Sequence, residues 1–457
     1  MRTEKDLLGT RQIPHNAYFG IHTKRAVENF PISGLLAHPI LIRAYGFIKQ
    51  AAALSNASLG LLDKNKAEAI INASKEVALG KFNNQFVVDV FQAGAGTSFH
   101  MNVNEVIANR ALELLGHKKG DYRKLHPNDD VNMAQSTNDT FPTAMRIAIL
   151  LKLKNFAPAL SKLSRTFHKK GMDFNTIIKT ARTHLQDAVP IRLGQEFDAY
   201  GRTLEKCLND ILRSAEDLQE IGIGGTAAGT GINAHPRYAR LVVQKLRVLT
   251  KLQKLKLSSN LIEIMQSQQA ISHFSSALKN CAVEINRIAN DLRLLASGPN
   301  TGLKEITLPS VQAGSSIMPG KINPSILECA TMVCMHVRGA DYAVSLAVSA
   351  GELNLNVCMP LMAYELLFSL DIFQNAITIM DEKCVRGITA DKKRCNDYAM
   401  SSPSVITALS PIIGYEKSAE IAKEFTKTGK SINDIILDKK ILTQKKVNDL
   451  LCVEKLT

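Results

Sequence analysis

Two stripes of apolar residues constrain the fold of this chain more than any other feature. In each stripe, apolar side chains recur every three or four residues over about four helical turns. This spacing places them on one face of an α-helix, and so long a face needs near-parallel neighbouring helices to cover it. The two stripes are Leu204, Leu208, Ile211, Ala215, Leu218 and Cys281, Ile285, Ile288, Leu292, Leu295.

Other parts of the chain also favour helix, whereas strand signals are few and short. Glycine-rich segments at 222–231 and 297–302 interrupt the helical runs. The fold class predicted from these patterns is mainly α, built on a bundle of long helices. The further stretches that are apolar and compatible with helix cover about 142–170, 190–221, 326–350 and 355–383.

The net charge does not indicate a nucleic-acid partner. The 457 residues carry a charge of +14, but the basic residues are spread out, and the densest runs, at 118–119 and 392–394, are short. Tryptophan is absent and aromatic residues make up 5% of the chain, so no platform for stacking bases is indicated. We interpret the charge mainly as a solvated surface, which also attracts anions.

Cysteines and apolar runs bear on the compartment in which the protein works. Eight cysteines are scattered singly, and no two form a Cys-x-x-Cys pair. This pattern favours reduced, mostly buried thiols over disulfides or a zinc site. No apolar run approaches the roughly 18–20 residues that span a bilayer, and the N-terminus does not read as a secretory signal. We therefore expect a cytoplasmic protein with no membrane partner and no metal.

The segment 314–324 reads Gly-Ser-Ser-Ile-Met-Pro-Gly-Lys-Ile-Asn-Pro. Its glycines permit backbone angles closed to other residues, and Pro319 limits where the chain can bend. Such a segment can close over a small anion, although the same residue types also build ordinary surface turns. The side chains that could donate hydrogen bonds to an anion are Ser315, Ser316, Lys321 and Asn323.

This undecapeptide resembles the signature loop of the fumarase/aspartase superfamily, lyases that release fumarate from substituted succinates. The resemblance runs from Leu8-Gly9-Thr10 to Gly387-Ile388-Thr389-Ala390 and covers essentially the whole chain. It implies a small N-terminal domain (1–137), a central bundle of long helices (138–391) and a small C-terminal helical domain (392–457). It also implies a homotetramer with a many-helix core, in which each active site is assembled from three subunits.

Ser136-Thr137-Asn138-Asp139 precedes Pro142 and a long apolar-periodic run. We interpret it as a helix start with capping side chains and a proline in the first turn. Capping accounts for one of these side chains but not for four in succession. A helix N-terminus with extra donors suits a carboxylate, and the resemblance implies that Ser136, Thr137 and Asn138 bind substrate.

Residues 183–190, Thr-His-Leu-Gln-Asp-Ala-Val-Pro, match a second segment of the family. A single histidine is more often structural than catalytic, but the resemblance implies that Thr183 binds substrate and that His184 orients it or passes protons. Glu328 is interpreted as a supporting partner of His184. The alternative for Glu328 is a capping box that begins at Ser325.

Gly94-Ala-Gly-Thr97-Ser98 opens a loop before a predicted helix, and the resemblance implies that Thr97 contacts substrate. His100, three residues after Thr97, departs from the family, whose members usually have Asn there. This larger and chargeable side chain either changes the contacts of the loop or is a neutral variation.

The resemblance also implies a mechanism that the residue types suit. Ser315 acts as the base, as an alkoxide that backbone N–H groups of the closed loop stabilise. One substrate carboxylate gains charge as the proton leaves, and preorganised donors must meet it. The donors assigned to that carboxylate are Thr97, Ser136, Thr137 and Ser316; Lys321, Asn323 and Thr183 are assigned to the other.

Within the family, several details resemble the aspartases: Thr137 in place of a second Ser, the insertion at 114–122, and the lead-in at 308–314. Residues 102–109 and 141–145 resemble the fumarases instead. We interpret the chain as a carbon–nitrogen lyase that reversibly eliminates ammonia from L-aspartate to give fumarate, with Asn138 on the amino group and no cofactor. The alternatives are a class II fumarase acting on L-malate and a structural relative that has lost catalysis.

Overall fold

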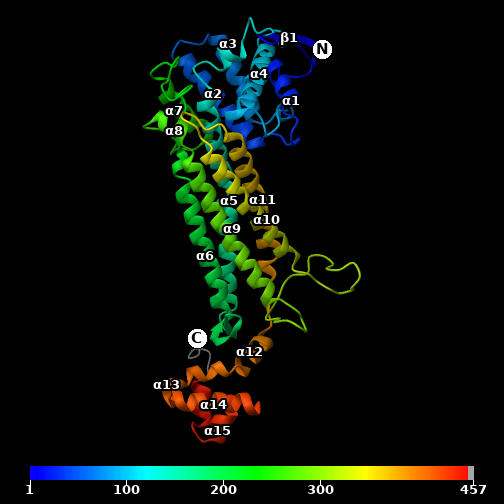
Figure 1. Cartoon of the computed structure of the whole chain (residues 1–457), viewed down its shortest axis with the longest axis vertical. Coiled ribbons are helices and arrows are strands. Elements are labelled where there is room, and N and C mark those ends of the chain that lie inside the picture. Colours follow the sequence, from blue (N-terminus) through cyan, green and yellow to red (C-terminus); the bar gives the residue numbers. More distant parts are fainter. Residues whose placement is uncertain (451–457) are drawn as a thin grey trace. The chain divides into compact units, whose positions relative to one another are not determined.

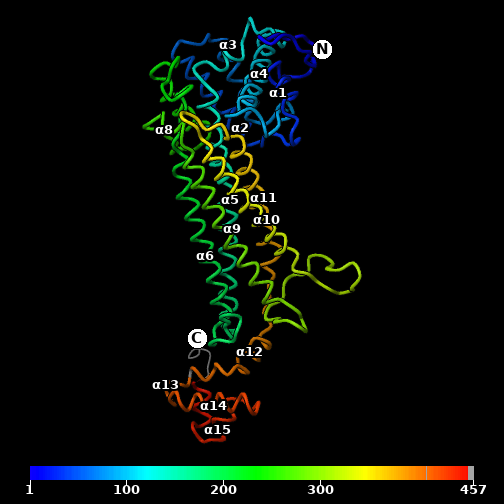
Figure 2. Tube along the Cα trace, in the orientation of Figure 1, coloured from blue at the N-terminus to red at the C-terminus, as the bar shows by residue number. Residues whose placement is uncertain are grey.

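The computed structural model describes residues 1–450, with every side chain except that of residue 408. Cys452 and the end of the predicted C-terminal domain lie outside the described residues. The chain is mainly helical, as predicted, and its strands are two to seven residues long. The long helices that run through the middle of the chain (Figures 1 and 2) are α5 (Thr137–Asp173), α6 (Leu193–Ser214), α9 (Gln269–Leu295), α10 (Ser325–Ser349) and α11 (Met359–Lys383).

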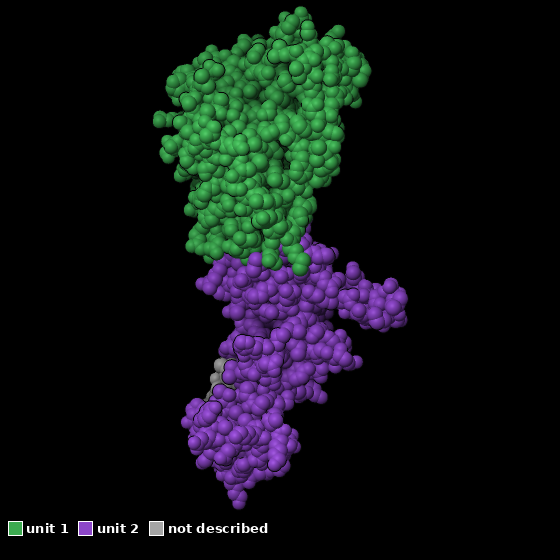
Figure 3. All heavy atoms as spheres, viewed as in Figure 1, with its two compact units in different colours: residues 1–158, 209–282, 335–374 green, residues 159–208, 283–334, 375–457 purple. Residues whose placement is uncertain are grey.

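The chain divides into two compact units, coloured separately in Figure 3. Unit 1 holds residues 1–158, 209–282 and 335–374, and unit 2 holds 159–208, 283–334 and 375 onward. Each long helix gives one part to unit 1 and the rest to unit 2. The predicted domain boundaries near 137 and 391 stay predictions.

Helix segments pack on one another within each unit. In unit 1, the rings of Phe156 on α5 and Phe373 on α11 lie 5.6 Å apart between centroids. In unit 2, Tyr200 on α6 donates to Asp291 on α9 (3.2 Å). Both contacts lie between residues far apart in the sequence, as a bundle of long helices requires.

Unit 1 also contains most of the shorter elements. These are β1 (Arg2–Asp6), β2 (Gly9–Ile13), α1 (Ile21–Asn29), α2 (Pro39–Ser58), α3 (Lys64–Ala78), α4 (Thr97–Leu114), β5 (Glu220–Ile221), α7 (Tyr238–Thr250), β6 (Lys256–Leu257) and α8 (Leu261–Gln266). Short turns of helix, η2 (Gly94–Gly96) and η3 (Pro127–Val131), lead toward α4 and α5. Strands β1 and β2 form an antiparallel hairpin, and β5 pairs with β6 in parallel.

Unit 2 carries a second hairpin and the C-terminal helices. Its elements are β3 (Ile178–Thr183), β4 (Gln186–Arg192), β7 (Ile306–Thr307), β8 (Thr389–Ala390), α12 (Lys392–Ser401), α13 (Ser410–Ile413), α14 (Tyr415–Thr428), α15 (Ile432–Asp438) and α16 (Gln444–Leu450). The last helices enclose a small apolar core of their own, which includes Leu409, Ile421, Ile435 and Val447.

The structure confirms one of the two predicted apolar stripes as a single helix and not the other. All five residues of the 281–295 stripe are buried on α9, which confirms that prediction. The 204–218 stripe was predicted as one helix, but α6 ends at Ser214. Ala215 and Leu218 are buried beyond that end, in a turn and a short 3-10 helix. Burial alone therefore does not extend a helix, because a following turn can point apolar side chains into the same core.

Two further observations concern predictions made from composition. Of the seven cysteines in the described part of the chain, five are buried. Across residues 1–450, no helix is both long enough and apolar enough to cross a membrane.

Candidate active site

The predicted residues of unit 1 gather where α4 and α5 begin. Gly96 precedes α4 with a positive φ of 87°. A Cβ at Gly96 would lie 2.2 Å from ring carbons of Phe141 on α5, so only glycine allows the two helix starts to come this close. Thr97 lies exposed at the first position of α4, and its hydroxyl donates to the Gly94 carbonyl at 3.4 Å.

The start of α5 is capped as the sequence predicts. Ser136 Oγ accepts from the Asn138 N–H (3.2 Å), and Asp139 Oδ1 accepts from the Ser136 N–H (3.0 Å). These two bonds form a reciprocal capping box with Asp139 in the third position. Pro142 is the sixth residue of α5, so the prediction of a first-turn proline is wrong by one turn.

The glycine-rich segment 222–231 folds over this helix start. The Gly224 and Thr226 N–H groups donate to Asp139 Oδ2 at 3.0 and 3.1 Å. Burial raises the pKa of the Asp139 carboxyl to about 7, against the lowering effect of its backbone hydrogen bonds. Asn138 Nδ2 donates to the Ala227 carbonyl at 2.8 Å, which leaves Asn138 Oδ1 as an acceptor.

His100 connects the two helix starts. It is 1% exposed, and its Nδ1 lies 2.8 Å from Thr137 Oγ1. Its Nε2 lies 2.8 Å from Nζ of Lys49, a fully buried lysine on α2. Burial and the nearby Lys49 hold the pKa of the His100 ring well below its usual range. The departure from the family at this position therefore touches a predicted substrate residue directly.

In unit 2, Thr183 and His184 stand at the tip of the β3–β4 hairpin. Thr183 pairs with Gln186, and the two residues between them both have positive φ angles, 54° at His184 and 58° at Leu185. Such a pair of angles is typical of a type I′ turn, which glycine and asparagine usually occupy. The turn exposes the side chains of Thr183 and His184.

Buried charges hold this hairpin in place. Glu305, which is fully buried, pairs with Arg182 (2.9 Å) and with Lys179 (3.1 Å) on β3. On the other strand, the Ala188 carbonyl accepts from Ser404 Oγ. The exposed turn thus grows from an anchored base.

The loop 314–324 closes on itself at its ends. The Gly314 N–H donates to the Lys321 carbonyl (2.8 Å), and Asn323 Nδ2 donates to the Gly314 carbonyl. A Cβ at Gly314 would lie 2.5 Å from the Lys321 carbonyl oxygen, so the crossing requires glycine. Ser315 Oγ accepts from the N–H groups of Ile317 (3.2 Å) and Met318 (2.9 Å). Ser316 and Lys321 are exposed.

Glu328 does not form the capping box considered from the sequence. Helix α10 begins at Ser325, whose buried hydroxyl has no hydrogen-bond partner among the described residues, and the Glu328 N–H donates to the Pro324 carbonyl at 3.1 Å. That alternative is therefore wrong, because Ser325 already belongs to the helix. Within the described residues, no hydrogen bond joins Glu328 to His184, and their partnership stays a prediction.

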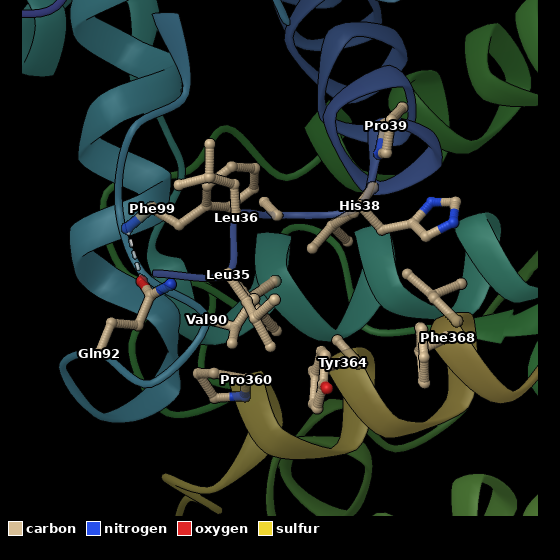
Figure 4. Close-up of a pocket in the computed structure, with 15 residues that line it drawn as sticks. Leu35, Leu36, His38, Pro39, Val90, Gln92, Phe99, Pro360, Tyr364 and Phe368 are labelled. Atoms are coloured by element: carbon tan, nitrogen blue, oxygen red, sulfur yellow. Dashed lines mark hydrogen bonds between the residues drawn. The ribbon is translucent and has the colours of Figure 1, made fainter. Parts of the chain in front are cut away.

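An apolar pocket of about 190 Å³ lies beside the unit 1 group (Figure 4). Leu35, Leu36 and Val90 face Pro360 and Tyr364 of α11 across it. None of the predicted substrate-binding residues lines this pocket. A dicarboxylate needs hydrogen-bond donors, so the pocket does not mark the proposed chemistry.

The predicted residues thus form two groups, one in each unit. Thr97, Ser136, Thr137 and Asn138 belong to unit 1, whereas Thr183, His184, Ser315, Ser316, Lys321, Asn323 and Glu328 belong to unit 2. In the described part of the chain, no three His, Cys, Asp or Glu side chains gather as metal ligands do.

A family model described as "Lyase" matches residues 9–339, and one described as "Fumarase C C-terminus" matches residues 405–457. The chain belongs to the fumarase/aspartase superfamily of lyases. Aspartate ammonia-lyase of Helicobacter pylori strain J99 is 47% identical to this lyase over 100% of the chain and 98% of its own length. The Escherichia coli K12 aspartate ammonia-lyase is 45% identical, over 100% and 96%.

Solved structures agree with this assignment. A fumarate lyase:delta crystallin from Brucella melitensis, bound to cobalt, matches the lyase chain with a TM-score of 0.96 and 47% identity, over 100% of this chain and 98% of the other. A class II fumarase from Schistosoma mansoni matches with a TM-score of 0.94 and 33% identity, over 98% of both chains. The three-dimensional match confirms the fold class predicted from the sequence.

Two residues that contact the unit 1 group were not among the residues predicted from the sequence. Asp139 was read only as a capping residue, although three backbone N–H groups converge on it. Lys49 was not singled out at all. Its sequence signal is a lysine one turn from Tyr45 and Ala52, among the mostly apolar residues of α2, where an unpaired charge could not be buried.

Proposed function

We propose that this chain is an aspartate ammonia-lyase, which eliminates ammonia reversibly from L-aspartate to give fumarate. Similarity to curated aspartate ammonia-lyases over the whole length, at 45–48% identity, carries the proposal. The reaction belongs to the carbon–nitrogen lyases, and its substrate is a small dicarboxylate.

Ser315 is proposed as the base that removes the proton next to the carboxylate. A serine hydroxyl is too weak an acid to ionise unaided. The two N–H groups that donate to Ser315 Oγ, from Ile317 and Met318, are the kind of donor that stabilises an alkoxide. Closure of the loop over bound substrate would exclude water and strengthen both bonds.

The remaining roles follow the chemistry of each side chain. Thr97, Ser136, Thr137 and Ser316 are proposed to hold the carboxylate on which charge develops, and Thr183, Lys321 and Asn323 the other. Asn138 is proposed to accept from the substrate ammonium, since its Nδ2 is occupied by Ala227 and its Oδ1 is available. His184 is proposed to orient substrate or pass protons, with Glu328 in support.

We also propose a cytoplasmic homotetramer whose active sites are shared between subunits. The division of the predicted residues into two groups, each belonging to a different unit, suits this arrangement. So does the outer face of α10, where Met335, Tyr342 and Leu346 are 57%, 69% and 54% exposed. Large apolar side chains on one exposed helix face are typical of an interface between copies. Domains at 1–137, 138–391 and 392–457 belong to the same proposal.

A class II fumarase is the second candidate, because the Schistosoma mansoni fumarase has nearly the same fold. Fumarate absorbs ultraviolet light, so one assay with L-aspartate and one with L-malate decides between the two. Fumarate from L-aspartate alone supports the proposal, and fumarate from L-malate alone overturns it. If neither substrate yields fumarate, the result would indicate a longer succinyl substrate or a relative that has lost catalysis.

A further inference from the structure

A chain of buried polar atoms runs from α2 to the predicted substrate residue Thr137. Lys49 Nζ lies 2.8 Å from His100 Nε2, and His100 Nδ1 lies 2.8 Å from Thr137 Oγ1. Lys49 and His100 are 0% and 1% exposed, and Thr137 is 8% exposed. Neither the capping of α5 nor the proposed base at Ser315 explains why these three side chains are joined by hydrogen bonds.

Two amides restrict what Lys49 can do. Nζ also lies 3.0 Å from Asn132 Oδ1 and 2.9 Å from Gln135 Oε1. The amide nitrogens of both residues donate to backbone carbonyls, which identifies the atoms that face Lys49 as oxygens. Lys49 must therefore donate to both amides, whatever its charge.

The third hydrogen bond of Lys49 Nζ, to His100, depends on the charge of the lysine. A Lys49 ammonium has a third proton, and it donates that proton to His100 Nε2. The neutral ring then carries its own proton on Nδ1 and donates it to Thr137 Oγ1. Since Thr137 Oγ1 accepts this bond, its hydroxyl proton is free to point away from His100, toward an anion.

A neutral Lys49 reverses the direction of both hydrogen bonds of His100. Its lone pair accepts from His100 Nε2, so Nδ1 becomes an acceptor and the Thr137 hydroxyl donates inward. The outward side of Thr137 Oγ1 then offers only lone pairs, which repel a carboxylate. Burial holds the pKa of Lys49 well below its usual range, whereas the Asp139 carboxylate opposes this shift. The two arrangements are therefore closer in free energy than an exposed lysine would allow.

We propose that Lys49, acting through His100, is a positioning residue that turns the Thr137 hydroxyl into a hydrogen-bond donor for a substrate carboxylate. This inference rests on the proposed function, in which Thr137 binds a dicarboxylate. It also gives His100 a role: the histidine relays the proton of Lys49. The carboxylate in turn favours the ammonium form, so binding and protonation of Lys49 support each other.

Other groups around Lys49 and His100 set the pH at which the hydrogen bonds from Lys49 to Thr137 change direction. Asp139 on α5 is the charged side chain whose field acts on Lys49. Tyr45 on α2 places its ring 5.5 Å from the His100 ring, and burial raises the pKa of its phenol well above the usual value. As pH rises through the pKa of Lys49, the third proton is lost and affinity for a carboxylate falls.

The test measures binding of succinate, a dicarboxylate without an amino group, to the full-length protein. Calorimetry at pH 7 to 10, in buffers of different ionisation enthalpy, gives both affinity and proton uptake. Wild-type protein is expected to lose affinity at alkaline pH and to take up protons on binding there. Lys49→Met is expected to bind roughly 10–100-fold more weakly at pH 7, the loss of one hydrogen bond to a charged group, with no proton uptake.

Two substitutions of His100 test whether this side chain acts through its hydrogen bonds or only fills space. His100→Asn keeps an amide whose oxygen can accept from Lys49 while its NH2 group donates toward Thr137, and a flip of the amide reverses both bonds. It should therefore hold affinity within roughly threefold at pH 7 and keep the alkaline loss. His100→Leu removes the donor and should match Lys49→Met. Tyr45→Phe, beside the same ring, is the control and should keep the wild-type pH profile. The two His100 variants decide the matter if Lys49→Met does not fold.

The outcomes for this inference and for the proposed function are distinguishable. If Lys49→Met and His100→Leu bind succinate as wild type does, or proton uptake persists in them, the inference is wrong while turnover of L-aspartate can remain. If succinate binding follows the expected pattern but L-aspartate yields no fumarate, the inference holds for a different dicarboxylate enzyme. A wild-type protein that turns over L-aspartate with an affinity independent of pH also overturns the inference.

Discussion

The start of α5 and the loop around Ser315 carry predicted site residues in opposite settings. At the start of α5, Thr137 and Asp139 are buried, and each side chain is held by a hydrogen bond from another protein group. In the loop, Ser316 and Lys321 are exposed, and the hydrogen bonds of Gly314 and Ser315 lie within the loop itself. Donors that are fixed in advance stabilise charge without reorganising, whereas a base needed only with substrate present can come from an exposed loop. We infer that unit 1 supplies preorganised donors, whereas the exposed loop of unit 2 supplies the base together with further carboxylate donors.

Ser315→Ala is the substitution with the largest expected effect, because it removes the proposed base. Turnover of L-aspartate should fall by about 10³-fold or more, while succinate affinity stays within a few-fold. Steady-state kinetics and calorimetry measure the two quantities. Ser310→Ala, an exposed serine shortly before the same loop, should behave as wild type. Wild-type turnover in Ser315→Ala would remove Ser315 from the mechanism.

The anchoring of the hairpin offers the next largest effect. Glu305→Gln leaves Arg182 without its buried partner, so the free energy of unfolding should fall by roughly 3–5 kcal/mol. Urea unfolding measures the loss, and hydrogen exchange should rise across 178–192. Arg213→Gln, which breaks an exposed ion pair with Asp210 on α6, is the control and should cost less than about 1 kcal/mol. Equal losses in both variants would contradict the anchoring role.

The buried carboxyl of Asp139 makes unit 1 sensitive to pH in a way that the exposed loop is not. Its pKa of about 7 exceeds the ordinary value of 3.8, so the folded state binds its proton more tightly. The free energy of unfolding should therefore fall as pH rises from about 4 to about 7, by at most about 4 kcal/mol from this group.

Asp139→Asn should remove that part of the pH dependence, which unfolding in urea at several pH values measures. Asp210→Asn, at an exposed position, serves as the control and should retain the wild-type slope. A slope unchanged in Asp139→Asn would show that the carboxyl stays ionised in the folded protein at pH 5.

The smallest expected effect concerns selectivity within the unit 1 group. Asn138→Ala removes the proposed acceptor for the substrate ammonium, so affinity for L-aspartate should fall roughly tenfold relative to succinate. Competition between the two ligands measures the ratio. Asn209→Ala, exposed on α6, should leave it unchanged. Equal loss for both ligands would place Asn138 in the support of the helix start, through Ala227, and not on the amino group.

Local patterns in the sequence predicted the bundle, the buried stripe on α9 and the capped start of α5, because each depends on residues within a few turns. The same local reasoning failed at the end of α6 and at Ser325. At Ser214 the helix stops although the apolar spacing continues. At Ser325 a serine followed by a glutamate resembles a cap, but the preceding Pro324 carbonyl already receives the Glu328 N–H.

By itself, the sequence determined that this chain is a helical lyase of the fumarase/aspartase superfamily, since short motifs and helical periodicity are written in consecutive residues. Only the tertiary structure decided how those motifs are connected. Lys49 meets His100 across 51 residues, and Asp139 meets the glycine-rich segment across 85. Which distant side chains share a buried site depends on how the helices pack, and no local pattern specifies that.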